Sequence, residues 1–269
     1  MFKFESGVPY LMPAHFGTFH TEKSSPRYLE STSMTIGYLT DREKLEQYLP
    51  EPFEIPGDPI VSVTYTQNKQ VEWMAGGGYN ILGVNIPCRF NGKEEQVDGA
   101  FALVLWENDT DPIIIGRETL GAPKIYAEIE DHQIIKGEWR TSASKRSHTF
   151  FEMTIRDLES VEEAELDQMG EMARQGNWMA WLYIPQMVGM DAPISHATCI
   201  PSSGDRPSRA ANGKGEIVWH ATTWEQNPMQ HHIINALADL PILEYRWARV
   251  TRGGSTMSDP DKKPLRVLR

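Results

Sequence analysis

Cysteine is scarce in this sequence: the chain has 269 residues and only two cysteines, Cys88 and Cys199. Their separation matches neither a disulfide framework nor the paired spacing of a metal site. With 40% apolar residues and eight tryptophans, a chain of this length can bury a core without disulfide support. We therefore expect both cysteines to be reduced thiols in a cytoplasmic protein.

Positive charge is also in short supply, because 26 Lys and Arg residues face 37 Asp and Glu residues and the formal net charge is -11. Nucleic-acid binding needs clustered Lys and Arg that displace phosphate counterions, so it is not expected. No apolar run is long enough to span a bilayer, and the first residues lack the continuous apolar segment of a signal peptide. The expected partner is a small molecule, and an anionic one would need a local arginine.

Linkers, internal repeats and low-complexity tracts are absent from the sequence, so we expect residues 1–269 to form one domain. Alternating apolar and polar residues predict antiparallel strands over 60–65, 99–107, 112–118, 125–130, 133–139, 149–155, 216–224 and 242–250. Thr40, Ser160 and Asn227 predict the beginnings of helices over 40–48, 160–175 and 228–240. The expected fold class is α+β, mainly antiparallel β, with a few helices outside.

Four glycines, Gly76, Gly77, Gly78 and Gly83, lie around Tyr79 and Asn80. The spacing superficially resembles a phosphate-binding loop, but no βαβ pattern surrounds it and no P-loop lysine follows. A bulged or tightly bent strand is the favoured interpretation.

A single lysine, Lys124, follows Pro123 in the segment GAPKIYAEIE. Most lysines are solvated, but the Gly-Ala-Pro bend leaves the backbone little freedom and can aim this side chain inward. A lysine in water has a pKa near ~10.4, and burial lowers it by roughly 3 to 5 units. A lysine that is dehydrated in this way is a nucleophile that attacks ketones and forms an iminium ion.

The segment GRETLGAPK, residues 116–124, resembles the active-site motif of the acetoacetate decarboxylase family. Further segments are similar to that family in the same order: YLTDREKLEQYLPEPFEI at 38–55, RFNG at 89–92, YIP at 183–185 and DLPILE at 239–244. The resemblance implies a β-barrel or cone-like core with peripheral sheets and helices. It also implies a homo-oligomer and a Schiff-base lysine at Lys124, the activated lysine for which this family is a standard example.

Two features depart from the family's decarboxylases. A second lysine follows the Schiff-base lysine there, whereas Ile125 occupies that position here. The two glutamates of those enzymes correspond to Thr64 and to residues 79–81, and neither carboxylate is present. Since acids and bases around an iminium decide which bond breaks, the departures favour another reaction. The resemblance then points to the aldolase-dehydratase branch, which condenses pyruvate-like 2-oxo acids with aldehydes or, in the retro-aldol direction, releases a small aldehyde from a larger aromatic molecule.

In this interpretation Lys124 forms the iminium of a 2-oxo acid, and no metal or cofactor is needed. The candidate proton carriers are Tyr79, Tyr245 and Glu118, and Arg27 or Arg117 is expected to hold the substrate carboxylate. Asn80 and Tyr79 are expected to hold a carbonyl or hydroxyl group. An aromatic aldehyde would fit a pocket lined by Tyr79, Trp106, Tyr245 and Trp247, although most of the eight tryptophans are expected in the core.

Two other functions stay open at this point. The same lysine fits a decarboxylase of acetoacetate or another β-keto acid, and the fold could instead hold an apolar ligand without catalysis. A metal site is not expected, because the adjacent His231 and His232 point about 100° apart on a helix. A serine hydrolase is not expected either, because the Gly-x-Ser-x-Gly motif is absent.

Overall fold

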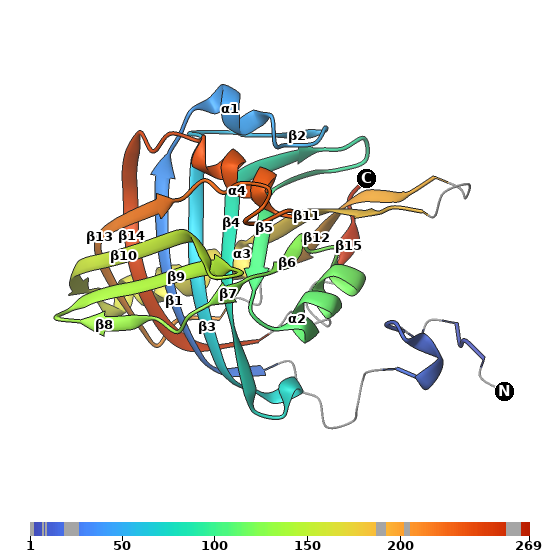
Figure 1. Ribbon diagram of the computed structural model, residues 1–269, viewed down its shortest axis with the longest axis horizontal. Helices are drawn as coiled ribbons and strands as arrows, with labels where there is room; N and C mark the ends of the chain where they lie inside the picture. The colour runs from blue at the N-terminus through green and yellow to red at the C-terminus, as the bar shows by residue number, and fades with distance from the viewer. Residues whose placement is uncertain are drawn as a thin grey trace.

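The computed structural model describes residues 3–6, 8, 10–18, 27–186, 192–201, 205–256 and 265–269. Its strands form one large sheet in the order β15-β12-β11-β5-β4-β3-β1-β14-β13-β10-β9-β7 (Figure 1). The central strands are β1 (Arg27–Leu39), β3 (Ile60–Val71), β4 (Gly77–Asn91), β5 (Gln96–Glu107) and β14 (Glu244–Thr256). These five pair antiparallel with their neighbours in this group.

The outer strands continue the sheet in both directions. On one side lie β13 (Arg209–Trp219), β10 (His148–Ser160), β9 (Glu138–Lys145), β7 (Glu128–Ile129) and β8 (Gln133–Ile135). On the other lie β11 (Asn177–Ile184), β12 (Ile194–Pro201) and β15 (Arg266–Val267), while β2 (Phe53–Glu54) pairs with β4 and β6 (Lys124–Tyr126) with β5. The mainly antiparallel α+β class is confirmed. The described sheet is not closed into a barrel, because β15 and β7 lie at its two ends.

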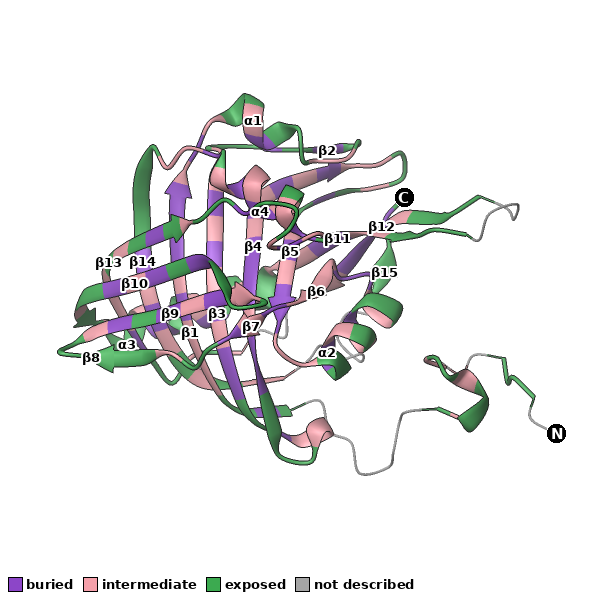
Figure 2. Ribbon diagram, in the orientation of Figure 1, coloured by how far each residue is buried: buried purple, intermediate pink, exposed green. Residues whose placement is uncertain are grey.

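Alternation along the central strands gives the sheet two different faces (Figure 2). In β1 the buried residues Met34, Ile36 and Tyr38 face one side, and Val61, Val63 and Tyr65 of β3 face the same side. They join Phe150, Phe151 and Met153 of β10 in one hydrophobic core. Strand β1 was not predicted from the sequence, although its apolar residues alternate with Ser and Thr as a half-buried strand requires.

The opposite side of the central strands, here named the hydroxyl face, carries Ser31, Ser33, Thr35, Thr64 and Thr66. Side chains on neighbouring strands pair across it: Ser33 Oγ lies 2.8 Å from Thr66 Oγ1, and Thr35 Oγ1 lies 3.2 Å from Thr64 Oγ1. These residues are half-buried, in contrast to the buried core on the other face. The sheet therefore presents a continuous polar surface along its centre.

The predicted helices exist but begin later than expected. Helix α1 (Arg42–Glu46) is capped by Asp41, whose side chain accepts from Lys44 N at 2.9 Å, and not by Thr40. Helix α3 (Glu163–Gln175) begins after Ser160, because Ser160 is the last residue of β10. Helix α4 (His231–Ala238) follows Gln230. A short η1 (Ala14–Phe16) and η2 (Glu72–Met74) complete the helical elements outside the site.

Two strand boundaries were also wrong. Residues 220–224 lie beyond the end of β13, and residues 209–215, left out of the predicted strand, belong to it. The glycine segment forms the beginning of β4 after a register shift between Asn68 and Val71 of β3, as expected for a bulged strand. Among the helices that the structure describes, none is long and apolar enough to cross a membrane.

Candidate active site

Lys124 is the first residue of the short strand β6, which pairs in parallel with the end of β5. Its partner in that pairing is Leu105, so the Lys124 side chain lies on the hydroxyl face, and Ile125 packs against the core instead. The Lys124 side chain is only 13% exposed. The bend before it is formed by Gly121, whose φ of 71° is a left-handed conformation that favours glycine.

A buried carboxylate stands next to the lysine. Lys124 Nζ lies 2.8 Å from Glu107 Oε1, and the Glu107 side chain is 0% exposed. The contact is an ion pair without the alignment of a directed hydrogen bond, and neither carboxylate oxygen has a hydrogen-bond donor among the described protein groups. Burial raises the pKa of Glu107, and the positive charge of Lys124 opposes that rise. The pair therefore places a proton acceptor in direct contact with the lysine head group.

A helical segment covers the lysine where the sequence predicted a strand. Residues 110–115 form α2 (Thr110–Ile115), and η3 (Gly116–Leu120) continues it as one turn of π-helix. The prediction was wrong because a short apolar run does not distinguish strand from helix, whereas Asp109 caps the helix by accepting from Asp111 N at 2.9 Å. A π-helical turn in a short helix often marks a functional site.

This segment holds Lys124 at both ends. The Lys124 ammonium donates to the carbonyl oxygen of Pro112 at 3.1 Å, and Arg117 Nη1 donates to the carbonyl oxygen of Lys124 at 2.8 Å. Gly116 supplies the space between them. A Cβ at Gly116 would lie 2.5 Å from Lys124 Cδ and Cε and 2.7 Å from Nζ. Any side chain at this position would displace the head group of the lysine.

Tyr79 lies on the same face of the sheet, in a chain of hydrogen-bonded rings. The Tyr79 hydroxyl is 3.2 Å from the Tyr28 hydroxyl, which accepts from Trp73 Nε1 at 3.2 Å. Burial raises the pKa of both tyrosines, and the negative charge of Glu107 raises each further. Both phenols therefore lie within electrostatic reach of Glu107 and are held in the protonated form.

Two of the predicted substrate-binding residues have other partners in the structure. Asn80 is buried and binds the chain near β7, because its Nδ2 donates to Ile129 O at 3.1 Å and to Asp131 Oδ1 at 2.9 Å. Trp106 is fully buried on the core face, where its Nε1 donates to Gln230 Oε1 at 3.1 Å. Both side chains thus point away from the hydroxyl face, since each alternates with a neighbour that faces it.

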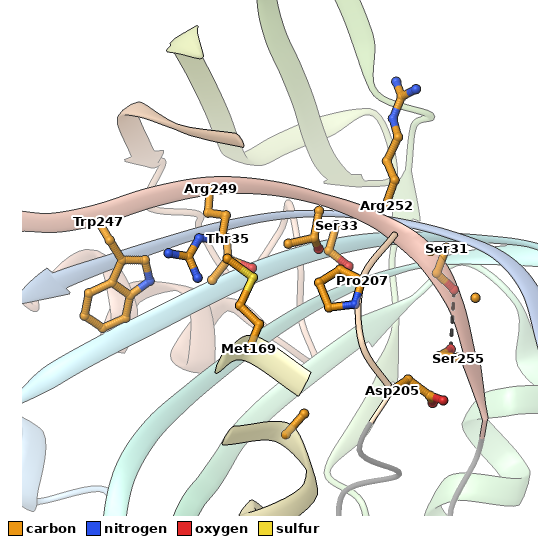
Figure 3. Close-up of a pocket in the computed structure, with 14 residues that line it drawn as sticks. Ser31, Ser33, Thr35, Met169, Asp205, Pro207, Trp247, Arg249, Arg252 and Ser255 are labelled. Carbon is orange, nitrogen blue, oxygen red and sulfur yellow. Dashed lines mark hydrogen bonds between the residues drawn. The ribbon is translucent and has the colours of Figure 1, made fainter. Parts of the chain in front are cut away.

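The remaining predicted residues lie at the surface. Glu118 and Arg117 are exposed on η3, and Arg27 is exposed at the beginning of β1. Tyr245 is 39% exposed and its hydroxyl accepts from Ile217 N at 3.0 Å. Trp247 lines a cavity of about 410 Å³ on the hydroxyl face beside β1 and β14, and Lys124 is not among the residues that line it (Figure 3).

Glu107 and Gly116 are the site residues that sequence reasoning missed. Glu107 was predicted as the last residue of the strand over 99–107 but was not considered as a site residue, although it continues the alternation of Leu103 and Leu105 in the sequence. That periodicity places a carboxylate on one face at the end of a buried strand, which is a signal for a functional group. In the part of the chain that the structure describes, no group of His, Cys, Asp and Glu could hold a metal ion.

The sequence is similar to a known protein family and to several of its members. The family model for acetoacetate decarboxylase matches residues 11–260. The acetoacetate decarboxylase of Ralstonia nicotianae is 27% identical over 228 residues, which are 83% of this chain and 82% of that protein. The Acidiphilium cryptum acetoacetate decarboxylase is 35% identical over 102 residues, only 38% of this chain and 39% of that protein.

Solved structures show the same fold at low sequence identity. Acetoacetate decarboxylase from Legionella pneumophila has a TM-score of 0.72 at 19% identity, covering 91% of this chain and 88% of that one. The enduracididine biosynthesis enzyme MppR, bound to the condensation product of pyruvate and imidazole 4-carboxaldehyde, has a TM-score of 0.71 at 14% identity and covers 98% and 97%. Since the family model matches nearly the whole sequence, the chain belongs to the acetoacetate decarboxylase family.

Proposed function

We propose that this protein is a Schiff-base lyase in which Lys124 is the nucleophile and Glu107 is its proton-transfer partner. The observation that carries the proposal is the Lys124–Glu107 pair, with 13% and 0% of the two side chains exposed and 2.8 Å between Nζ and Oε1. A buried ion pair is a poor device for stability, because desolvation cancels much of its attraction. A nucleophilic amine beside a proton acceptor is instead the arrangement that carbonyl chemistry needs.

The first step makes the covalent bond. Glu107 takes one proton from the Lys124 ammonium, which leaves a neutral amine and a neutral carboxylic acid. The amine nitrogen attacks the ketone carbon and forms a carbinolamine, and Glu107 returns the proton to the departing hydroxyl, which leaves as water. The products are an iminium ion on Lys124 and the Glu107 carboxylate, so the pair begins and ends the step with the same charges.

In the second step the iminium withdraws electrons from the neighbouring carbon. With pyruvate, a base removes a proton from C3 and the electrons move into an enamine. Glu107 is the nearest carboxylate to the amine. The enamine carbon then bonds to an aldehyde, and its alkoxide takes a proton. The adduct then loses a second C3 proton and the hydroxyl group, which leaves as water. Hydrolysis of the iminium finally releases an unsaturated 2-oxo acid.

Aldol-dehydration is preferred to decarboxylation for two reasons. The positions that correspond to the two glutamates of the decarboxylases carry no carboxylate here. Three of these positions, Thr64, Tyr79 and Ile81, lie on the same face of the sheet as Lys124. MppR, of the same fold, is known bound to a condensation product of pyruvate and an aldehyde. Decarboxylation of a β-keto acid is the second candidate, favoured by relatives such as the Ralstonia nicotianae acetoacetate decarboxylase. Tyr79 lies on the same face of the sheet as Lys124, and its hydroxyl, 3.2 Å from that of Tyr28, is the candidate proton donor for either reaction.

Borohydride trapping tests the proposal directly. The protein is incubated with pyruvate, or separately with acetoacetate, then reduced, and the intact mass is measured before peptide mapping. We expect pyruvate to add one reduced equivalent at Lys124. Labelling by acetoacetate with release of CO2 would establish the decarboxylase instead, and no increment with either compound would reject covalent catalysis.

Gly116→Ala is expected to lower the rate of adduct formation by about 100-fold, because the new methyl group displaces the lysine head group. The backbone of Gly116 is right-handed helical, with φ of −64°, so alanine strains nothing except this contact. Urea unfolding should show a loss of roughly 1–3 kcal/mol from overpacking. Gly57→Ala is the matched control, because a Cβ at Gly57 meets no atom within 4 Å. A Gly116→Ala variant that labels at the wild-type rate would contradict the assigned geometry.

A further inference from the structure

A single cross-strand row on the hydroxyl face connects Lys124 with the cavity that contains Trp247. The strand registers pair each residue of this row with the next: Lys124, Leu105, Gly83, Thr64, Thr35 and Arg249. Paired residues point to the same side of a sheet, so all six positions share one surface. The hydroxyls of Thr35 and Thr64, 3.2 Å apart, confirm this arrangement in the middle of the row.

Gly83 is the residue of this row that has no side chain. It lies between Thr64 and Leu105 and has no side chain above the sheet. A Cβ at Gly83 would meet its nearest atoms, in Asn85 and Leu105, at 3.6 Å or more, which is ordinary contact. Neither close packing nor an unusual backbone conformation therefore requires glycine here. The absent side chain leaves room on the surface between the lysine and the hydroxyl pairs.

The row ends, at Thr35 and Arg249, in a cavity of about 410 Å³. The Trp247 ring lies directly on the backbone of Gly37, where a Cβ would fall 2.2 Å from ring atoms, and the side chain is 43% exposed. In Figure 3 Trp247, Arg249 and Thr35 lie on one side of the strands with Met169 of α3, and Arg252 points away. Arg249 is neutralised by Glu165 at 2.8 Å. An uncharged flat group is thus the better match for this end.

We propose that this row is the floor of a substrate groove, with Gly83 as a specificity-determining residue and Trp247 as the platform for a ring at the far end. Strands are about 4.8 Å apart, so the five steps from β6 to β14 span roughly 24 Å. The Lys124 head group lies at Glu107 of β5 and the Trp247 ring lies on Gly37 of β1, and these two strands are three steps, or roughly 14 Å, apart. The inference rests on the proposed function and extends it. The substrate is an elongated 2-oxo acid or its precursor aldehyde, with the reacting carbonyl at Lys124 and a flat aromatic ring distant from it.

The test compares two 2-oxo acids in the same labelling reaction. Pyruvate is the short probe, and 4-(biphenyl-4-yl)-2-oxobut-3-enoate is the long probe, whose two rings extend from the reacting carbonyl along the proposed groove. The readout is the concentration of each acid that gives half-maximal borohydride-trapped adduct at Lys124. Gly83→Val places two methyl groups in the groove, Trp247→Ala removes the platform, and Gly57→Val is the matched control in open space.

We expect Gly83→Val to raise the half-maximal concentration of the long acid at least tenfold more than that of pyruvate. Trp247→Ala should weaken the long acid about threefold or more, as loss of an aromatic contact predicts. Equal effects of Gly83→Val on both acids, or wild-type protein that labels with pyruvate and not with the long acid, would overturn the groove. If wild-type protein labels with neither, the Schiff-base function itself fails, and that outcome is separate.

Discussion

Lys124→Met is expected to abolish the trapped pyruvate adduct and to lower turnover by about 10⁴-fold or more, because methionine fills the same space without a nucleophile. The adduct is measured by intact mass and turnover by the absorbance of the unsaturated 2-oxo acid. Lys93→Met is the control, since Lys93 is exposed and has the same chemistry in solvent. If the Lys124→Met variant still labels to the wild-type extent at any mapped lysine, the assignment of the nucleophile is refuted.

The same substitution has a pH-dependent effect on stability. Glu107 already has a raised pKa because it is buried, and methionine removes the positive charge that holds that pKa down. A carboxyl whose pKa is raised in the folded state costs stability as the pH rises above its unfolded value, near ~4.3. The free energy of unfolding of Lys124→Met should thus fall from pH 5 to pH 8 relative to wild type. The double variant Lys124→Met with Glu107→Gln should lose that dependence.

Glu107→Gln is expected to lower turnover by about 10²- to 10⁴-fold, the usual contribution of one general acid–base group. Glutamine keeps the shape of the side chain but cannot take the proton of the amine or balance the charge of the iminium. Exchange of the C3 hydrogens of pyruvate in D2O, followed by NMR, isolates the enamine step. Glu94→Gln, at an exposed position, controls for the loss of one charge.

Two results would decide the role of Glu107. If C3 exchange in Glu107→Gln falls together with turnover, the carboxylate acts in the proton transfers. If exchange continues at the wild-type rate, another group is the base, and Glu107 serves only to set the charge around the lysine. Circular dichroism and urea unfolding must show a folded protein in either case, because removal of one member of a buried pair costs about 3–5 kcal/mol when the other stays charged.

Lys124 could be proposed as the nucleophile from the sequence, because a rigid bend before a lysine and the family-like segment around it lie within nine residues. The contact of Lys124 with Glu107 could not be predicted in this way, because Glu107 lies 17 positions earlier and meets the lysine only through the pairing of β5 with β6. Contacts of that kind depend on strand register. Local propensity carries no information about register, and the candidate proton carriers drawn from nearby residues, such as Glu118, lie at the surface instead.

The cover over the lysine was mistaken for a strand for a related reason. Residues 112–115 are apolar and partly β-branched, which satisfies the pattern of a buried strand as well as that of a short helix. The Asp109 cap decides for the helix, and the tertiary position next to β6 then favours a π-helical turn at Gly116. Trp106 illustrates the opposite error: an aromatic residue next to the site faces the core because its neighbour Glu107 faces the lysine.

The two contacts of the lysine head group have a consequence for the order of events during turnover. An ammonium has three N–H bonds and can face Pro112 O and Glu107 together, at 3.1 Å and 2.8 Å. An iminium nitrogen has one hydrogen, so the Lys124 nitrogen must lose its contact with one of these two partners in every catalytic cycle. The Pro112 carbonyl also accepts from the amide of Gly116, which makes it the partner that can be released without leaving a buried oxygen unsatisfied.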